Sequence, residues 1–300
     1  MPVVNLHTLP QFSDRISWVY VEYGRIEKTD NGLIFRDKTG ETPLPVAALS
    51  TLLLGPGTVI THRAACAAAQ MNCLLTWVGE GVIRLYASAT GGAHQTRNLY
   101  RQARRWADPL SRLAVVRRMY EKRFGEALSP DLVLQEIRGR EGARVRAAYQ
   151  RLAQECGIKW VRREYDPANW DKADLPNRCL SSATACLYGV VHAALVSAGY
   201  SPALGFIHTG APLSFVYDVA DLYKLELGVR IAFEVAAKPP KFPDREVRKR
   251  CRAAFLSTNL MERILPDVED LLNVSEADDD RDDLDGLPSP FAGGIDAVVD

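Results

Sequence analysis

Over the first part of the chain, apolar side chains follow the pattern of β-strands. Short runs rich in β-branched and aromatic residues predict strands at 16–23, 33–35, 73–78 and 82–86. Asn31-Gly32 is a strong hairpin-turn signal before the second of these runs. A short helix is predicted from an N-cap at Thr61 to Met71. We therefore expect a small, sandwich-like β-sheet domain over residues 1–90.

After Gly91-Gly92, which is typical of a linker, the spacing of apolar residues becomes helical. Asp108-Pro109 supplies a cap and a first-turn proline for a helix to Phe124. The segment that begins at Ser129-Pro130 is expected to end at Gly139. The remaining helices are predicted at 140–156, 176–198, 213–237 and 244–272, with a stop at Gly157 and a break near Ser257. The chain is thus expected to be α+β, with a larger all-α domain over residues 91–273.

The formal net charge of zero conceals an uneven distribution. Residues 274–300 contain nine acidic residues and only one basic residue, Arg281. Removing them from the totals of 37 and 37 leaves 36 basic and 28 acidic residues, a net charge of about +8. We expect this acidic tail to be disordered because it is also poor in apolar residues. A basic body suits a phosphate-bearing partner, although charge alone is equally compatible with a well-solvated surface.

Other features of the composition predict a cytoplasmic protein. The apolar fraction is 47%, and no apolar run approaches the roughly 20 residues that a bilayer-spanning helix needs. Residues 1–14 lack the basic and apolar regions of a signal peptide. The six cysteines show no Cys-x-x-Cys spacing, which favours reduced thiols: Cys66, Cys73, Cys156, Cys179, Cys186 and Cys251.

Candidate metal ligands lie around one histidine. His208 precedes a predicted helix that carries Asp218, Asp221 and Lys224, and spacings of three place these side chains on one helical face. Carboxylates gathered beside a histidine suit a hard cation once another ligand arrives from elsewhere. The alternative is a core histidine with two carboxylates on the surface.

Glu141 is a candidate for that further ligand because it is one carboxylate among four arginines in residues 138–146. The alternative interpretation is that Glu141 forms solvated ion pairs.

A basic stripe is predicted near the C-terminal end of the helical region. Arg245, Arg248 and Arg252 have the i, i+3, i+7 spacing of one helix face, which can follow a phosphate backbone or form a solvated helix flank. Tyr165, Trp170 and Tyr188 could stack on unpaired bases or pack in the core. Tyr188 lacks the arginine–histidine–arginine arrangement expected around a covalent tyrosine nucleophile.

Taken together, these residues resemble the subtype I-E branch of the CRISPR-associated integrase family, the universal adaptation enzyme. The resemblance covers about Arg15 to Asp270. Its specific stretches are residues 134–146 (LQEIRGREGARVR), 205–221 (GFIHTGAPLSFVYDVAD) and 243–248 (PDREVR), with weaker support from DKTG at 37–40 and WVGE at 77–80.

The resemblance implies a role for each candidate residue. Glu141, His208 and Asp221 would be ligands of Mg²⁺ or Mn²⁺. Asp218 would assist them, and Tyr188 and Lys224 would be positioning groups. The residues implied in DNA binding are Arg84, Arg245, Arg248 and Arg252, with Tyr23 as an aromatic wedge at the duplex end.

The implied reaction joins the 3′-hydroxyl ends of a short protospacer duplex to phosphodiesters at a CRISPR repeat boundary. The implied assembly contains homodimers bridged by a small ferredoxin-like adaptation subunit. Two other functions remain open: a metal-dependent endonuclease on branched DNA, and a non-catalytic DNA-binding scaffold.

Overall fold

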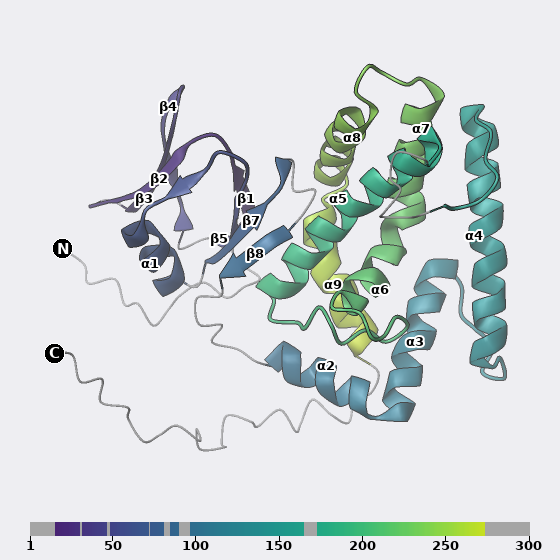
Figure 1. Cartoon of the computed structure of the whole chain (residues 1–300). Helices are drawn as coiled ribbons and strands as arrows, with labels where there is room; N and C mark the ends of the chain where they lie inside the picture. The colour runs from purple at the N-terminus through teal and green to yellow at the C-terminus, as the bar shows by residue number, and fades with distance from the viewer. Residues whose placement is uncertain are drawn as a thin grey trace.

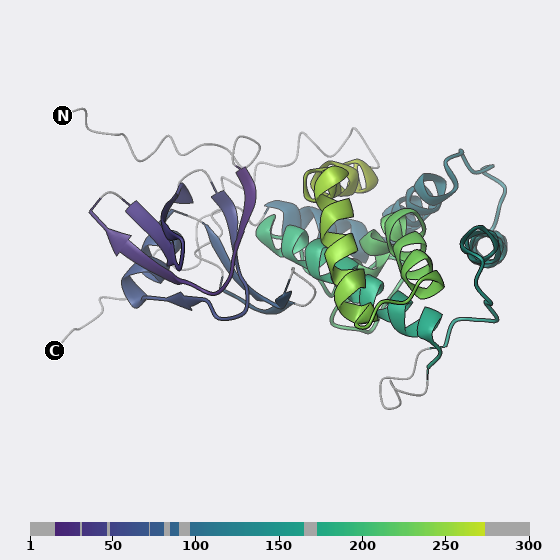
Figure 2. The ribbon, with the colours of Figure 1, turned by 90° about the horizontal axis from the view of Figure 1, so that it is seen from above.

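The computed structural model describes residues 16–30, 32–46, 49–71, 73–80, 85–89, 97–164 and 173–273. Its N-terminal strands form two sheets, and the rest of the described chain is mostly helical (Figures 1 and 2). The predicted α+β class is therefore confirmed. The acidic tail, Arg84, Tyr165 and Trp170 lie outside the described residues. The predicted domain boundaries at residues 90 and 273 fall at the edges of undescribed segments and stay predictions.

Each sheet has four strands. The first has the order β1-β5-β7-β8, with β1, β5 and β7 parallel and β8 antiparallel to β7. These strands are β1 (Ile16–Val21), β5 (Leu49–Leu54), β7 (Leu74–Val78) and β8 (Leu85–Ala89). The second sheet has the order β4-β3-β2-β6. Its strands are β2 (Arg25–Thr29), β3 (Gly32–Asp37), β4 (Gly40–Leu44) and β6 (Val59–Ile60).

The predicted hairpin joins β2 and β3, where Thr29 lies opposite Gly32. Successive side chains of a strand point to opposite faces of the sheet, so the strands of the first sheet contribute residues to two separate cores. Leu52 and Leu54 pack in a small core with Ile26, Phe35 and helix α1 (His62–Gln70). Leu53 points to the other face and joins the core of the helical region. The sheet is therefore buried on both sides.

The helical region contains a helix that the sequence analysis did not specify, α2 (Arg97–Ala107), ahead of α3 (Pro109–Phe124). Asp108 caps α3 as predicted, because its side chain accepts a hydrogen bond from the Ser111 N–H at 2.8 Å. The predicted break at Gly139 is wrong, because α4 runs without interruption from Leu134 to Cys156. Glu136 stabilises the earlier start, since its carboxylate accepts the Val133 N–H.

The remaining helices follow the predicted spans closely. They are α5 (Leu175–Ser197), α6 (Ser214–Tyr223), a π-helical stretch (Lys224–Val229), α7 (Arg230–Ala237), α8 (Pro243–Ser257) and α9 (Leu260–Leu272). The predicted 213–237 helix is thus continuous but contains the π-helical stretch. The expected break near Ser257 is confirmed by Asn259, whose φ of 47° is left-handed.

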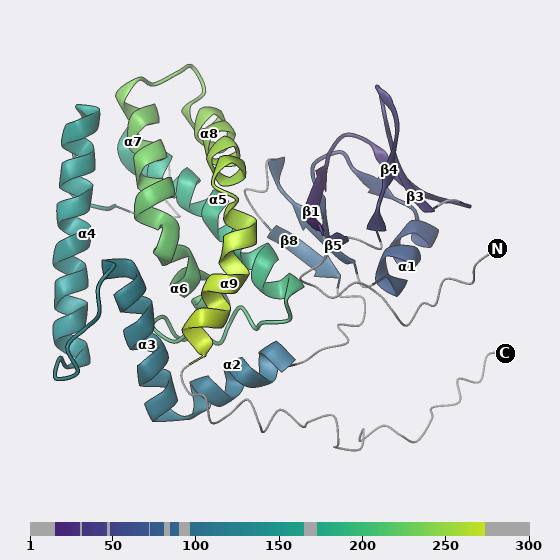
Figure 3. The same ribbon diagram turned by 180° about the vertical axis from the view of Figure 1, so that it is seen from behind.

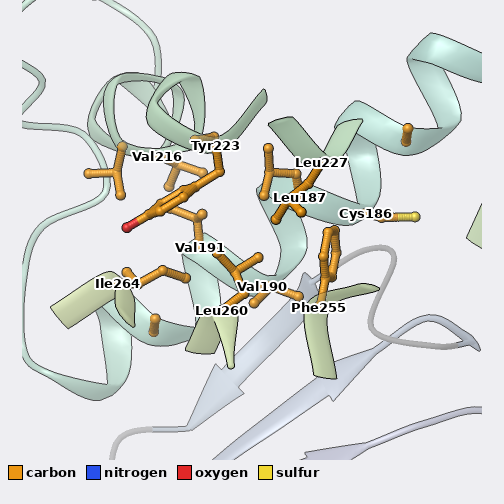
Figure 4. Close-up of a cluster of buried hydrophobic side chains, with 14 of the residues drawn as sticks. Cys186, Leu187, Val190, Val191, Val216, Tyr223, Leu227, Phe255, Leu260 and Ile264 are labelled. Carbon is orange, nitrogen blue, oxygen red and sulfur yellow. The ribbon is translucent and has the colours of Figure 1, made fainter. Parts of the chain in front are cut away.

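Helix α5 forms the centre of the helical region. It contacts α6, α7, α8 and α9 as well as strands β5, β7 and β8. Figure 4 shows Leu187, Val190 and Val191 of α5 among side chains of α6, α8 and α9. By length and composition, α5 could cross a membrane, but 72% of its apolar window is buried inside the protein. Helix α4 stands at the edge far from the sheets (Figure 3).

Candidate metal and nucleic-acid site

The loop before α6 is bound to a buried carboxylate. Asp218 of α6 has no exposed surface, and its carboxylate accepts the backbone N–H groups of Phe206, Ile207 and His208 at 2.6, 3.0 and 2.9 Å. The same carboxylate lies 2.7 Å from Nδ1 of His208. Because its oxygens are fully used, Asp218 has little capacity left to bind a cation.

This contact fixes the orientation of His208. The Asp218 carboxylate favours a proton on Nδ1, which leaves Nε2 as a lone-pair donor. The His208 side chain is 43% exposed, and no residue of the described chain hydrogen-bonds to Nε2. A carboxylate behind an imidazole in this way is the usual support of a metal-binding histidine.

The carbonyl groups of the same loop are held by α2 and α3. Gln102 donates to the carbonyls of Ser201 and Leu204 at 2.9 and 3.0 Å. Trp106 Nε1 donates to the Gly205 carbonyl at 3.0 Å, and Arg112 donates to the Phe206 carbonyl at 3.3 Å. The loop is therefore bound through its N–H groups on one side and its carbonyls on the other.

Gly205 is required by the tightness of this turn. A Cβ at this position would lie 2.3 Å from the His208 carbonyl oxygen and 2.6 Å from Cβ of Ser214. Both are well inside van der Waals contact, so a larger residue would displace the loop that carries His208.

A buried arginine that the sequence analysis missed connects the other two predicted ligands. Arg123, at the end of α3, has only 4% of its side chain exposed. Its Nη1 lies 3.7 Å from Oε1 of Glu141, and its Nη2 lies 3.5 Å from Oδ2 of Asp221. Nη2 also donates to the backbone carbonyl of Asp218 at 3.1 Å. Carboxylates from α4 and α6 are thus brought to one guanidinium.

Each of these carboxylates has a second cationic partner. Arg144 donates to both oxygens of Glu141, at 2.8 and 3.1 Å. Lys224 donates to Oδ1 of Asp221 at 3.3 Å. The expected solvated ion pairs of Glu141 are therefore partly realised, although its side chain is only 13% exposed.

Tyr188 lies beside this cluster. Its ring centroid is 4.8 Å from that of Tyr217, which in turn lies 5.9 Å from the His208 ring. Burial raises the pKa of Tyr188, and the charge of Asp221 raises it further. The phenol is therefore protonated at neutral pH, which suits a hydrogen-bond donor and opposes a role as an ionised nucleophile.

The donor chemistry of the predicted ligands suits Mg²⁺ or Mn²⁺, because it consists of two carboxylates and one oriented imidazole. The side chains are not gathered as a finished ligand set, however. Within the described residues, no three His, Cys, Asp or Glu side chains lie close enough to hold a metal ion. The cationic partners of Glu141 and Asp221 account for this arrangement, since each carboxylate is directed at an arginine or lysine.

Comparison with known proteins decides the family. Residues 122–270 match the family model described as CRISPR associated protein Cas1. The chain is 47% identical over 288 residues to the CRISPR-associated endonuclease Cas1 of Geobacter sulfurreducens, covering 95% of this chain and 91% of that protein. The corresponding Escherichia coli protein is 46% identical over 272 residues, covering 90% and 89%. This chain belongs to the Cas1 family.

Solved Cas1 structures agree with this assignment. A crystal structure of a TtCas1–DNA complex superposes with a TM-score of 0.80 at 46% identity, covering 88% of this chain and 99% of that one. A casposase bound to an integration product reaches a TM-score of 0.52 at 14% identity, which shows a shared fold. The resemblance found from the sequence is therefore confirmed at the level of the family.

The matched Cas1 region runs from the end of α3 into α9 and contains the whole cluster around Arg123. It also contains the predicted basic stripe of α8. Arg245 is exposed there, whereas Arg248 is half-buried with its Nε unpartnered. Arg252 lies over the Tyr20 ring of β1, 5.3 Å from the centroid. The stripe therefore extends from solvent to the contact between helices and sheet.

The predicted aromatic wedge lies outside the matched Cas1 region. Tyr23 is 63% exposed and has a φ of 53° in the turn after β1. Its backbone N–H donates to the Pro56 carbonyl at 2.9 Å, which holds the turn in place. The exposed ring is available for stacking, and its predicted role in capping a duplex stays a prediction.

Proposed function

We propose that this member of the Cas1 endonuclease and integrase family is a divalent-metal-dependent DNA integrase. It would join the 3′-hydroxyl ends of a short duplex to phosphodiesters at a CRISPR repeat boundary. The main support is the convergence of Glu141 and Asp221 on Arg123, beside a histidine that Asp218 orients. Three helices and one loop supply these groups, so the proposed ligands come from distant parts of the chain.

Glu141, Asp221 and Nε2 of His208 would hold Mg²⁺ or Mn²⁺. Oxygen ligands with one imidazole suit these hard cations better than softer ones. Bound there, the ion would polarise the scissile phosphate and offset the negative charge that develops during in-line displacement. Arg144 and Lys224 would release the carboxylates and turn toward phosphate oxygens.

The other residues would position the reactants. Asp218 keeps the Nε2 lone pair of His208 directed outward. Tyr188 offers a protonated phenol beside Asp221 and can donate a hydrogen bond to a phosphate or hydroxyl oxygen. Arg245 and Arg248 would bind phosphate groups of the duplex, and Tyr23 would stack on its end.

Double-stranded DNA is the proposed partner, in line with the TtCas1–DNA complex. A complete insertion needs one attack on each strand, so it requires two spaced sites. We therefore propose a homodimer as the functional unit, with two dimers bridged by a small ferredoxin-like adaptation subunit.

A metal-dependent endonuclease is the second candidate, because the similar bacterial proteins are named CRISPR-associated endonucleases. The two reactions share the metal ligands and differ in the nucleophile. Water gives a cut end, whereas a DNA 3′-hydroxyl gives a joined, branched product.

A strand-joining assay tests the proposal. A labelled short duplex and a supercoiled repeat plasmid are incubated with the protein and the adaptation subunit, with Mn²⁺ or with chelator. The integrase predicts metal-dependent transfer of label to the plasmid, which His208→Ala abolishes while DNA binding is retained. Nicking without label transfer would favour the endonuclease, and binding without either product would identify a scaffold.

A further inference from the structure

The cluster around Arg123 is electrically balanced without a metal ion. Glu141 and Asp221 form ion pairs with the three cations Arg123, Arg144 and Lys224. The nearby Asp218 carboxylate, held by backbone N–H groups and His208, brings a third negative charge. A bound divalent cation would therefore leave an excess of about two positive charges in a partly buried site. Phosphate groups of DNA are the natural source of compensating charge.

Arg123 differs from the other two cations because it is fixed. It is almost fully buried, donates to the Asp218 backbone carbonyl, and lies 5.5 Å from the centroid of the Tyr120 ring. Its Nε is buried without a hydrogen-bond partner in the described chain. The positive charge is therefore kept in the site although one of its N–H donors is unsatisfied. Arg144 and Lys224 are 32% and 27% exposed and can move into solvent.

The contacts of Arg123 with the carboxylates are also long. Its separations of 3.7 Å from Glu141 and 3.5 Å from Asp221 are ion-pair distances without a hydrogen bond. Arg123 thus offsets the repulsion between the two carboxylates without hydrogen-bonding to their oxygens, which within the described residues are held only by the more exposed Arg144 and Lys224. Its fixed positive charge would at the same time oppose a bound metal cation.

We propose that Arg123 is a positioning residue that makes metal binding at this site depend on DNA. It holds Glu141 and Asp221 near one another before the metal ion arrives, and it weakens metal binding until a DNA phosphate supplies negative charge. By linkage, the metal ion strengthens DNA binding by the same factor. The inference rests on the proposed metal site. It adds that the binding of DNA and the binding of the metal ion depend on one another.

The test is a Mn²⁺ titration of the full-length protein, in which electron paramagnetic resonance measures the free aqueous ion. It is made with and without a short DNA duplex, and Mn²⁺ bound by the duplex alone is subtracted. We expect the duplex to tighten Mn²⁺ binding by about tenfold or more. Equal Mn²⁺ affinity with and without the duplex would overturn the inference.

Variants of Arg123 separate its charge from its packing. Arg123→Gln is expected to raise the DNA-free Mn²⁺ affinity by about tenfold and to reduce the gain from DNA. Arg123→Lys keeps the charge and is expected to behave as the wild type. Weaker DNA-free Mn²⁺ binding by Arg123→Gln would mean that Arg123 acts only by holding the carboxylates together, and it would overturn the inference.

Arg117→Gln is the matched control on the same helix, since Arg117 contacts the carbonyls of Ser129 and Leu132 and neither carboxylate. It should leave Mn²⁺ affinity unchanged; a rise equal to that of Arg123→Gln would overturn the specific role of Arg123. If Arg123→Gln does not fold, Arg123→Met removes the charge with an apolar side chain suited to this buried position and should raise the affinity in its place. Absence of Mn²⁺ binding even with DNA would overturn the proposed metal site itself.

Discussion

Asp218 and Asp221 lie three residues apart on α6, yet their surroundings give them different roles. Asp218 has no exposed surface and accepts three backbone N–H groups, whereas Asp221 is 21% exposed and pairs with the side chains of Arg123 and Lys224. Helical spacing predicted that both would lie near His208. It could not predict which one is buried, because the burial depends on how residues 205–208 fold over the helix.

Asp218→Asn should therefore cost stability, whereas Asp221→Asn should not. An amide nitrogen at position 218 faces N–H donors and loses charge-assisted hydrogen bonds, so we expect the free energy of unfolding to fall by about 1–3 kcal/mol. Asp221→Asn is expected to change it by less than about 1 kcal/mol while abolishing strand joining. Denaturant unfolding monitored by circular dichroism measures both. Equal losses of stability would contradict the assigned roles.

Arg123 shows where sequence analysis reaches its limit. The chain has 37 lysines and arginines, and nothing local distinguishes Arg123 from its neighbours on α3. Its partners Glu141, Asp218 and Asp221 lie on other helices, and only the packing of α3 against α4 and α6 brings them together. Gln102, Trp106 and Arg112 were missed for the same reason.

At the scale of elements, several predictions that depend only on a residue and its neighbours along the chain were correct. Thr61 and Asp108 cap their helices as predicted, and Gly157 ends α4 with a φ of 67°. Gly139 was misread because glycines such as Gly139 and Gly142 are tolerated inside a long helix, where the flanking residues sustain the hydrogen-bond ladder. The β-sheet order could not be predicted, since parallel pairs such as β1 and β5 join distant segments.

Two glycine-to-alanine substitutions are expected to change the free energy of unfolding in opposite directions. Gly205→Ala places a Cβ against the His208 carbonyl and is expected to lower the free energy of unfolding by about 1–3 kcal/mol and to impair strand joining. Gly139→Ala meets nothing within 4 Å and should raise it by about 0.5–1 kcal/mol, with joining unchanged. Thermal unfolding of the two variants checks both signs. A stabilised Gly205→Ala would refute the tight turn described for this loop.

At the scale of the whole molecule, the helical core contains several buried tyrosines whose ionisation is coupled to folding. Burial raises the pKa of Tyr149 and of Tyr200 to about 12. Because the unfolded value is about 10, these phenols contribute stability that is complete below pH 10. That stability is lost as the pH rises toward 12.

Alkaline titration should therefore show tyrosines that ionise only on unfolding. Tyr149 and Tyr200 should become ionised only as the helical signal is lost. Tyrosinate absorbance and circular dichroism, recorded over the same pH range, measure the two events. Ionisation of all 11 tyrosines in the folded protein would contradict the burial described here.

The proposed binding of DNA by exposed basic residues also belongs to the scale of the whole molecule. Arg245→Glu should weaken DNA binding and reduce the dependence of the affinity on salt, because one exposed phosphate contact of α8 is lost. Arg151→Glu makes the same charge change at an exposed position of α4, the helix at the edge of the molecule far from the sheets, and should leave the salt dependence nearly unchanged (Figure 1). Measuring the DNA affinity of both variants over a series of salt concentrations tests this prediction. Equal effects of the two variants would remove α8 from the DNA path.

A DNA 3′-hydroxyl is the proposed nucleophile at the metal site proposed for Glu141, His208 and Asp221. The most direct measurement compares a labelled duplex with ordinary 3′-hydroxyl ends and the same duplex with dideoxy ends, each incubated with repeat plasmid, adaptation subunit and Mn²⁺. We predict transfer of label to the plasmid only from the 3′-hydroxyl duplex, and none with His208→Ala. Plasmid cleavage to the same extent with both duplexes, without joined product, would contradict the claim and identify water as the nucleophile.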